Sequence, residues 1–139
     1  MRYFLFASHG RFAEGILHSV EMITGKHDNI WTLCAYIDEH DDIKSQIQEF
    51  LSEVADNDEL VVITDIFGGS INNEFMSLLD DKRIHLVTGL NIPLVIELIT
   101  MNNIEVNTAK LIKTALYNSK KTIKYCNLEL EISQLDEEF

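Results

Sequence analysis

The sequence predicts an α/β fold, with an open, mainly parallel four-stranded sheet and helices on both of its faces. Two observations predict this fold. Short apolar segments, typical of strands buried on both faces, alternate with segments in which apolar residues recur at helical spacing. The connections between these segments are short, which favours right-handed strand–helix–strand units and therefore parallel pairing.

The size and composition of the chain indicate a single domain. The chain has 139 residues, of which 46% are hydrophobic and one is a proline. A chain of this length can bury a substantial core, and no linker rich in Gly, Ser or Pro divides it. We therefore expect one domain over residues 1–139.

Four apolar segments are the predicted strands: residues 3–7, 30–37, 60–64 and 84–88. The first two flank a predicted helix that begins at Arg11, with an apolar stripe at Phe12, Ile16, Val20 and Ile23. A second stripe follows the second strand, at Ile43, Ile47, Phe50, Leu51 and Val54. Asp41 and Asp42 precede this second stripe and are candidate helix caps.

The C-terminal segment has a different pattern. Cys126, Leu128, Leu130 and Ile132 alternate with polar residues, and such a two-residue period is typical of a strand with one buried face. We therefore predict an antiparallel edge strand within residues 122–133, followed by an acidic tail at 134–139. The apolar row could be covered within the chain or by exchange between two subunits of a dimer.

The charge of the chain excludes one class of ligand. The formal net charge is −12, which argues against nucleic acid because phosphate backbones need a basic surface.

The longest apolar runs are far too short to span a bilayer, and the first residues lack the features of a secretory signal. The cysteines, Cys34 and Cys126, show no metal-ligand spacing. We expect a cytoplasmic protein with buried, reduced thiols and no metal.

His9 has the most informative position in the chain. It belongs to Ser8-His9-Gly10, which ends the first predicted strand just before a helix begins. Open α/β sheets bind ligands beyond the carboxyl ends of their strands, and a helix amino terminus offers unpaired N–H groups that suit a phosphoryl group. A histidine at this point is a candidate nucleophile.

Asp65 is the candidate partner of His9. It interrupts apolar sequence at the end of the third predicted strand, and burying a lone carboxylate is costly unless it is paired. The first and third strands of a doubly wound sheet can be neighbours, so both side chains would reach one edge. Asp65 would then fix the tautomer of His9 and leave the other ring nitrogen free to attack. By itself, Asp65 could instead cap the following turn.

The segment Gly68-Gly69-Ser70 follows Asp65 and opens another predicted helix. Glycine permits close backbone approach and serine supplies a hydroxyl. Gly69 and Ser70, together with Gly10, are therefore candidate phosphate-binding residues. A Gly-Gly-Ser sequence alone is more often a turn than a phosphate site. The other histidines are expected to be structural or solvent-facing: His18, His27, His40 and His85.

Three segments resemble one known family. Residues 6–10 with Ala13-Glu14 resemble the active-site segment of mannose-type IIA domains of the bacterial phosphoenolpyruvate-dependent sugar phosphotransferase system (PTS), the mannose/fructose/sorbose family. Residues 64–70 resemble the second signature of that family, and residues 89–94 resemble the third. The three motifs occur in the same order and at similar spacing, and they cover most of the chain.

The resemblance implies a phosphoryl relay. The histidine at position 9 would accept a phosphoryl group from the phosphocarrier protein HPr and pass it to a IIB domain for sugar uptake, with Asp65 as the orienting carboxylate. It also implies a cytoplasmic homodimer, whose last strand crosses to the partner subunit, with only indirect association with the membrane IIC and IID components. The sugar contacts those membrane components, so the resemblance implies no particular sugar.

Two other functions are compatible with the same motifs. One is the phosphoryl-donor subunit of a dihydroxyacetone kinase, which uses a similar domain but often carries further domains. The other is a regulatory module whose phosphorylation state controls a transcription regulator. The sequence contains no Gly-x-x-x-x-Gly-Lys-Ser/Thr loop and no metal-ligand cluster, so we expect no cofactor for any of these functions.

Overall fold

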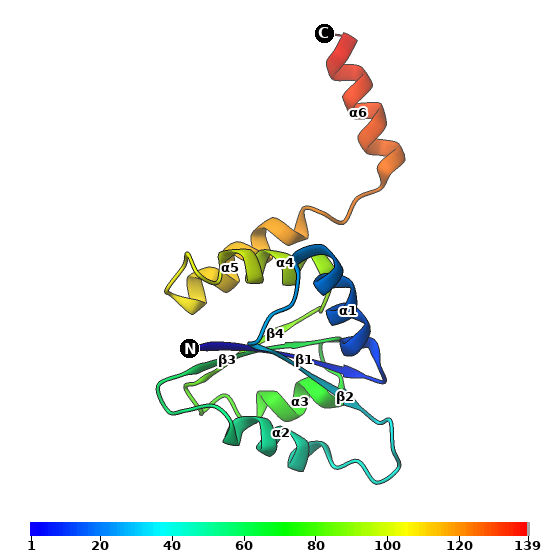
Figure 1. Ribbon diagram of the computed structural model, residues 1–139. Helices are drawn as coiled ribbons and strands as arrows, with labels where there is room; N and C mark the ends of the chain where they lie inside the picture. The colour runs from blue at the N-terminus through cyan, green and yellow to red at the C-terminus, as the bar shows by residue number, and fades with distance from the viewer. Residues whose placement is uncertain (139) are drawn as a thin grey trace.

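Four parallel strands form the centre of the fold, as the sequence predicts (Figure 1). In the computed structural model, which describes residues 1–138, they are β1 (Arg2–His9), β2 (Ile30–Ala35), β3 (Glu59–Thr64) and β4 (Ile84–Thr88). Their order is β2-β1-β3-β4, and every pairing is parallel. The expectation that the first and third strands are neighbours is confirmed.

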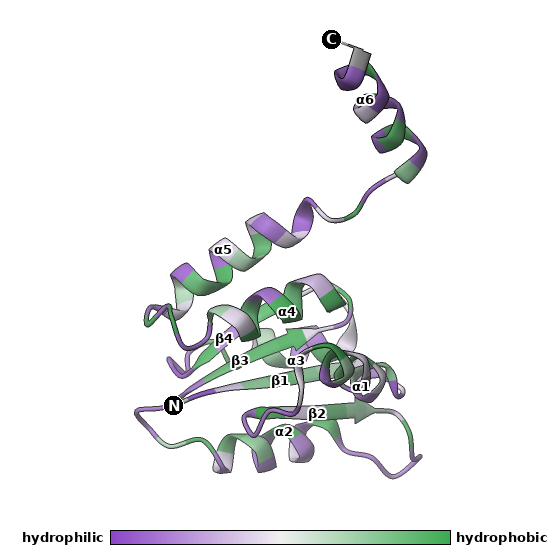
Figure 2. Cartoon of the chain, turned by 45° about the horizontal axis from the view of Figure 1, so that its top comes forward, coloured by the Kyte–Doolittle hydropathy of each residue, from purple (hydrophilic) through white to green (hydrophobic). Residues whose placement is uncertain are grey.

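Helices cover both faces of the sheet (Figure 1). On one face lie α1 (Phe12–Thr24), α4 (Ile92–Met101) and α5 (Thr108–Lys120), and on the other lie α2 (Ile43–Ser52) and α3 (Ser70–Met76). Successive residues of a strand point to opposite faces of the sheet. Phe4 and Phe6 therefore pack in the core beneath α1, α4 and α5, whereas Leu5 and Ala7 pack in the core beneath α2 and α3. The central strands are therefore mainly apolar between their polar ends, and Figure 2 shows β3 largely in green.

The strand order creates a switch point between β1 and β3. From β1 the chain crosses to β2 at one side, and from β3 it crosses to β4 at the other. The two connections leave the sheet in opposite directions, and in open α/β sheets such a switch point marks the crevice at the carboxyl ends of the strands in which ligands bind. His9 is the last residue of β1, and Asp65 directly follows β3.

Side-chain hydrogen bonds to main-chain N–H groups mark the starts of α1 and α2. The buried hydroxyl of Ser8 accepts the Ala13 N–H at 2.8 Å, so α1 starts within three residues of His9. The Asp42 carboxylate accepts the Lys44 N–H at 3.1 Å, which confirms Asp42 as the cap of α2. Asp41 instead accepts the Asp38 N–H in the preceding turn. A cap of this kind typically contributes about 1 kcal/mol to helix stability.

The predicted C-terminal strand is wrong for this chain. Residues Cys126–Glu138 form α6, which extends away from the body of the molecule (Figure 1). The apolar residues Leu128, Ile132 and Leu135 also recur at helical spacing, and the abundant Leu and Glu residues are strong helix formers. Residues 134–138, predicted as an acidic tail, continue this helix, and Phe139 lies outside the described residues.

The apolar side chains of α6 are about half exposed among the described residues. Leu128 is 49% exposed and Ile132 is 46% exposed, and Figure 2 shows green and purple patches alternating along the projecting helix. Cys126, expected to be buried, is exposed, and Cys34 is half-buried. Among residues 1–138, no helix combines the length and the apolar character needed to cross a membrane.

Candidate active site at the carboxyl edge of the sheet

The structure brings His9 and Asp65 together at the switch point. The Asp65 Oδ2 atom lies 2.9 Å from the Nδ1 atom of His9, and it also accepts the main-chain N–H of His9 at 2.9 Å. The other carboxylate oxygen accepts the N–H of Ile66 at 3.0 Å. Asp65 therefore both pairs with His9 and holds the turn that follows β3, so the two roles considered for it coexist.

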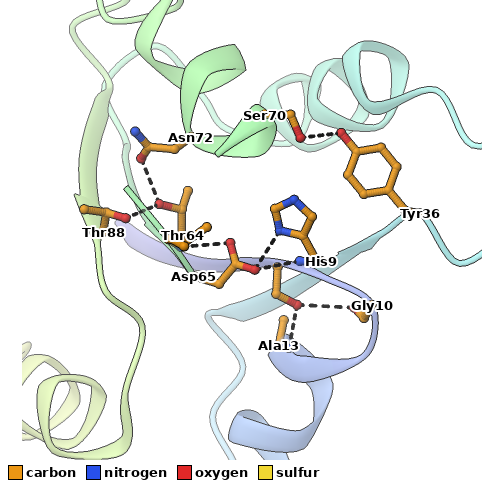
Figure 3. A network of polar contacts seen from close by, with 11 residues as sticks. His9, Gly10, Ala13, Tyr36, Thr64, Asp65, Ser70, Asn72 and Thr88 are labelled. Carbon is orange, nitrogen blue, oxygen red and sulfur yellow. Dashed lines mark hydrogen bonds and ion pairs between the residues drawn. The ribbon is translucent and has the colours of Figure 1, made fainter. Parts of the chain in front are cut away.

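The charge of Asp65 sets the tautomer of His9. Partial burial raises the pKa of Asp65, but the hydrogen bonds from the main chain and ring of His9 outweigh it, so the pKa lies below its ordinary value. An ionised carboxylate only accepts hydrogen bonds, so the neutral imidazole carries its proton on Nδ1 and its lone pair on Nε2. Figure 3 shows the second ring nitrogen pointing away from Asp65.

The side chain of His9 is more exposed to solvent than that of Asp65. The side chain of His9 is 44% exposed, whereas that of Asp65 is 15% exposed. The ring can therefore meet a macromolecular partner while its orienting carboxylate stays in the protein. This arrangement suits a nucleophile that exchanges a group with another protein.

Two glycines shape the space around the imidazole. A Cβ atom on Gly69 would lie 2.9 Å from the Ile66 side chain and 3.4 Å from the His9 Cε1 atom. Glycine at this position therefore allows the ring to lie against the start of α3. Gly10 has a φ of 58°, in the left-handed region that favours glycine, and its N–H donates to the Ala35 carbonyl at 2.9 Å. It turns the chain from β1 into α1.

Two hydroxyls lie on the side of His9 that faces away from Asp65 (Figure 3). Ser70, the first residue of α3, has its Oγ atom 2.6 Å from the hydroxyl of Tyr36. The Tyr36 ring centroid lies 5.4 Å from that of His9. Ser70 was predicted at this site, but Tyr36 was not, because it lies inside the predicted strand 30–37. In the structure β2 ends at Ala35, so Tyr36 directly follows a strand that ends at the same edge.

A buried network of polar side chains lies next to the site, at the ends of β3 and β4. The Thr64 hydroxyl donates to the Asn72 side-chain oxygen at 2.8 Å and lies 2.8 Å from the Thr88 hydroxyl. Thr64 is completely buried and Asn72 is 2% exposed, so these polar groups need the hydrogen bonds that the network supplies. The network joins the ends of β3 and β4 to α3, which carries Ser70. Sequence reasoning missed it, although polar residues at the ends of apolar strands were a signal.

The third signature motif serves the scaffold. The side-chain oxygen of Asn91 accepts the Leu94 N–H at 3.0 Å and caps α4. The N–H groups of Gly89 and Leu90 donate to the Thr64 carbonyl at 2.9 and 3.0 Å. The motif thus fastens the loop after β4 to the end of β3 and supplies no group to the His9 pair.

The fold and this edge together define an open α/β domain with an oriented, accessible histidine at its switch point. A family model described as the PTS system fructose IIA component, EIIA-man, matches residues 3–116. The chain belongs to this family, which makes it a PTS sugar IIA component with a general role in phosphotransfer. The resemblance to mannose-type IIA domains is thereby confirmed.

Individual relatives agree with the family assignment. A structure from Klebsiella pneumoniae subsp. pneumoniae MGH 78578, described as a candidate phosphoenolpyruvate-dependent sugar PTS permease, is 50% identical with a TM-score of 0.89 and covers 93% of both chains. A PTS IIA protein associated with the fucose utilization operon of Streptococcus pneumoniae is 32% identical with a TM-score of 0.73, over 93% of this chain and 96% of that one. The PTS system fructose-specific EIIA component of Bacillus subtilis strain 168 is 22% identical over 129 residues, 91% of this chain and 88% of that protein.

Proposed function

We propose that this protein relays a phosphoryl group through His9, from phospho-HPr to a IIB domain, in sugar uptake. The observation that carries the proposal is the orientation of the ring. Nδ1 is held by Asp65 at 2.9 Å, and the second nitrogen points into the exposed space beside Ser70 (Figure 3). The family assignment supports the same chemistry.

The transfer step follows from that orientation. The Nε2 lone pair of His9 attacks the phosphorus atom of phospho-HPr, the donor P–N bond breaks, and its electron pair returns to the donor histidine. The new P–Nε2 bond forms while the proton stays on Nδ1, hydrogen-bonded to Asp65. The carboxylate stabilises the positive charge that develops on the ring. A nucleophile of the IIB domain then attacks the same phosphorus and frees Nε2.

Gly10, Gly69 and Ser70 are the proposed phosphate-binding residues. Gly69 lacks the Cβ that would crowd the ring, so a phosphoryl group on Nε2 can approach the backbone there. The Ser70 hydroxyl at the start of α3 can donate to a phosphoryl oxygen. Gly10 contributes backbone at the opposite end of the crevice, beside the start of α1.

The surface around His9 supports docking of protein partners. Phe12 is 48% exposed, Ile66 is 58% exposed and Phe67 is 76% exposed, and each belongs to or adjoins a loop of the crevice. Exposed apolar side chains close to a reactive group are typical of protein interaction sites. We assign this rim to HPr and the IIB domain in turn, in a cytoplasmic protein whose association with the membrane IIC and IID components is indirect.

The C-terminal helix supports the proposed homodimer. Residues 106–128 contain five lysines and no acidic residue, whereas residues 129–138 contain five acidic residues and no basic one. The acidic half of α6 projects from the body with its apolar side chains uncovered (Figure 1). A second copy offers both an apolar partner and the complementary basic segment, so we propose that α6 packs against the partner subunit.

Two variants test this dimer. Leu128 and Ile132 lie on one face of α6, and Leu130 lies on the opposite face. We expect Leu128→Ser/Ile132→Ser to give monomers in light scattering at micromolar concentration, and Leu130→Ser to remain dimeric. If the segment were exchanged as a strand, all three residues would share one face and Leu130→Ser would dissociate the dimer as well. A monomeric full-length protein would rule out the homodimer.

The proposed relay is tested with the purified components. We expect incubation with phosphoenolpyruvate, enzyme I and HPr to place one acid-labile, base-stable phosphoryl group on each chain. Addition of IIB domains is expected to remove it. Retention of the group with IIB domains, but loss to a nucleotide-bearing dihydroxyacetone kinase subunit, would favour the kinase function instead. Retention with both would favour a regulatory role.

A further inference from the structure

Tyr36 has an unusual backbone conformation for its residue type. Its φ is 62°, in the left-handed region. Among the described residues, Tyr36 is the only residue other than glycine with a positive φ. Bulky side chains rarely adopt this conformation because of steric strain, and strained residues of this kind cluster at functional sites. The conformation directs the Tyr36 side chain over the carboxyl edge toward His9 and Ser70 (Figure 3).

Core packing does not explain this arrangement. Tyr36 is 51% exposed and follows β2 in the loop before α2. Its side chain contacts the ring of His9, at 5.4 Å between centroids, and the hydroxyl of Ser70, at 2.6 Å. Both contacts belong to the crevice. Because Tyr36 has a strained conformation and contacts two residues of the proposed active site, its position indicates a functional role rather than a packing role.

Resting on the proposed function, we propose that Tyr36 is a second hydroxyl donor to the phosphoryl group on His9. In the unphosphorylated protein, the hydroxyls of Tyr36 and Ser70 satisfy each other. After transfer, the phosphoryl oxygens replace that contact, and both hydroxyls donate to them. This exchange is favourable because a hydrogen bond to an anionic oxygen is stronger than one between neutral hydroxyls.

The chemistry of the phenol suits this role. Its O–H is a stronger acid than that of serine and so a better donor to an anion. Ser70 approaches from α3 and Tyr36 from the end of β2, so the two hydroxyls can grip the phosphoryl group from different sides. Asp65 meanwhile holds Nδ1. The phosphorylated imidazole would then be fixed at both of its nitrogen atoms.

The titration of the phosphoryl group tests the proposal without any contribution from partner docking. We would phosphorylate the full-length protein, remove HPr, and follow the ³¹P resonance of phosphohistidine against pH. Hydrogen bonds to the dianion stabilise it and lower its pKa. We expect Tyr36→Phe, which keeps the ring and loses the hydroxyl, to raise that pKa by roughly 0.5 to 1.

A matched control separates this effect from loss of a tyrosine hydroxyl in general. Tyr117 lies on α5, where its ring packs under the Lys121 ammonium at 3.8 Å. Tyr117→Phe is expected to titrate as the unmodified protein does. We also expect Tyr36→Phe to slow transfer from phospho-HPr about tenfold, with little change in the apparent KM for HPr.

The outcomes are distinct. An unchanged phosphoryl pKa in phosphorylated Tyr36→Phe would overturn the role of Tyr36 and leave the relay through His9 intact. A rise in KM alone would assign Tyr36 to partner docking and also overturn the proposal. Failure of the unmodified protein to accept any phosphoryl group would overturn the proposed function, and the role of Tyr36 with it.

Discussion

Two histidine–carboxylate pairs lie at opposite edges of the same sheet, and only one has the surroundings of a reactive site. At the carboxyl edge, His9 Nδ1 lies 2.9 Å from Asp65 Oδ2. At the amino edge, His85 Nε2 lies 2.6 Å from Glu59 Oε2. The shorter distance belongs to the amino-edge pair, whose carboxylate is also bonded to Thr108, so proximity of an imidazole and a carboxylate does not itself define function.

The amino-edge pair belongs to a structural chain of hydrogen bonds. The other oxygen of Glu59 accepts the Thr108 hydroxyl at 2.7 Å, and that hydroxyl accepts Nε–H of Arg2 at 2.9 Å. The rest of the Arg2 guanidinium donates to oxygen atoms between α4 and α5, on Asn102, Glu105 and Val106. These contacts fasten the connection between two helices to β1 and β3.

The carboxyl-edge pair has different neighbours. Asp65 is satisfied by main-chain N–H groups of His9 and Ile66 besides the ring, so it needs no further side chain. The second nitrogen of His9 faces Ser70 and Tyr36 (Figure 3), on a side chain that is 44% exposed. The environment of the free nitrogen, rather than the ion pair, separates a candidate nucleophile from a structural histidine.

The largest expected difference between the two pairs is in phosphorylation itself. His9→Gln removes the proposed nucleophile, so we expect no phosphoryl label after incubation with phosphoenolpyruvate, enzyme I and HPr. His85→Gln keeps a hydrogen-bonding side chain at the amino edge, and we expect full labelling. A labelled His9→Gln protein would break the comparison, and mapping of the phosphopeptide would identify the true site.

The carboxylates are expected to differ in rate. An amide at position 65 can donate its N–H to the imidazole, favour the wrong tautomer and leave the developing positive charge without an anion. Loss of such a partner typically slows a reaction by about 10²–10⁴, and we expect that range for Asp65→Asn in rapid-quench transfer from phospho-HPr. Glu59→Gln is the matched control at the other edge. Equal rates for the two variants would reduce Asp65 to a turn-capping residue.

Stability is expected to show the opposite ranking. Arg2 makes five hydrogen bonds to four residues at the amino edge, so Arg2→Ala leaves several acceptors unpaired. We expect the free energy of unfolding in urea to fall by about 2 kcal/mol, with normal transfer by the folded protein. Lys82→Ala, at an exposed position, is the control. Loss of transfer at full stability would show that the two edges are coupled.

The fold and the His9–Asp65 contact followed from local sequence patterns. Strands such as 60–64 are apolar on both faces because helices cover both, and that pattern distinguishes a parallel sheet. Once β1 and β3 are neighbours, the end of each apolar run fixes which side chains reach the crevice. Ser8, His9 and Asp65 are polar residues at those ends, and the location of the site could therefore be predicted from the sequence.

The remaining features depend on contacts that no local pattern records. The left-handed backbone of Tyr36 becomes visible only with its hydroxyl beside Ser70, which is 34 positions away in the chain. In α6, Leu128 and Ile132 fit both a two-residue and a helical period, so the pattern at those positions could not decide between strand and helix.

The smallest expected effect concerns the pH dependence of stability at the amino edge. Burial raises the pKa of Glu59, but hydrogen bonds from Thr108 and His85 outweigh it, so the pKa is lowered in the folded protein. A carboxylate of this kind stabilises the fold above its unfolded pKa of about 4.3, and that contribution is lost as the pH falls through the folded pKa.

Glu59→Gln has no such group, so its free energy of unfolding is expected to fall less steeply between pH 6 and pH 3. The expected difference is on the order of a few tenths of a kcal/mol. Other carboxylates with lowered pKa values, Asp42, Asp65 and Asp81, are present in both proteins and cancel in the difference. Urea unfolding across this range, with Glu53→Gln as an exposed control, measures the difference. Parallel profiles for Glu59→Gln and the unmodified protein would mean that the amino-edge pair contributes no more than any surface carboxylate.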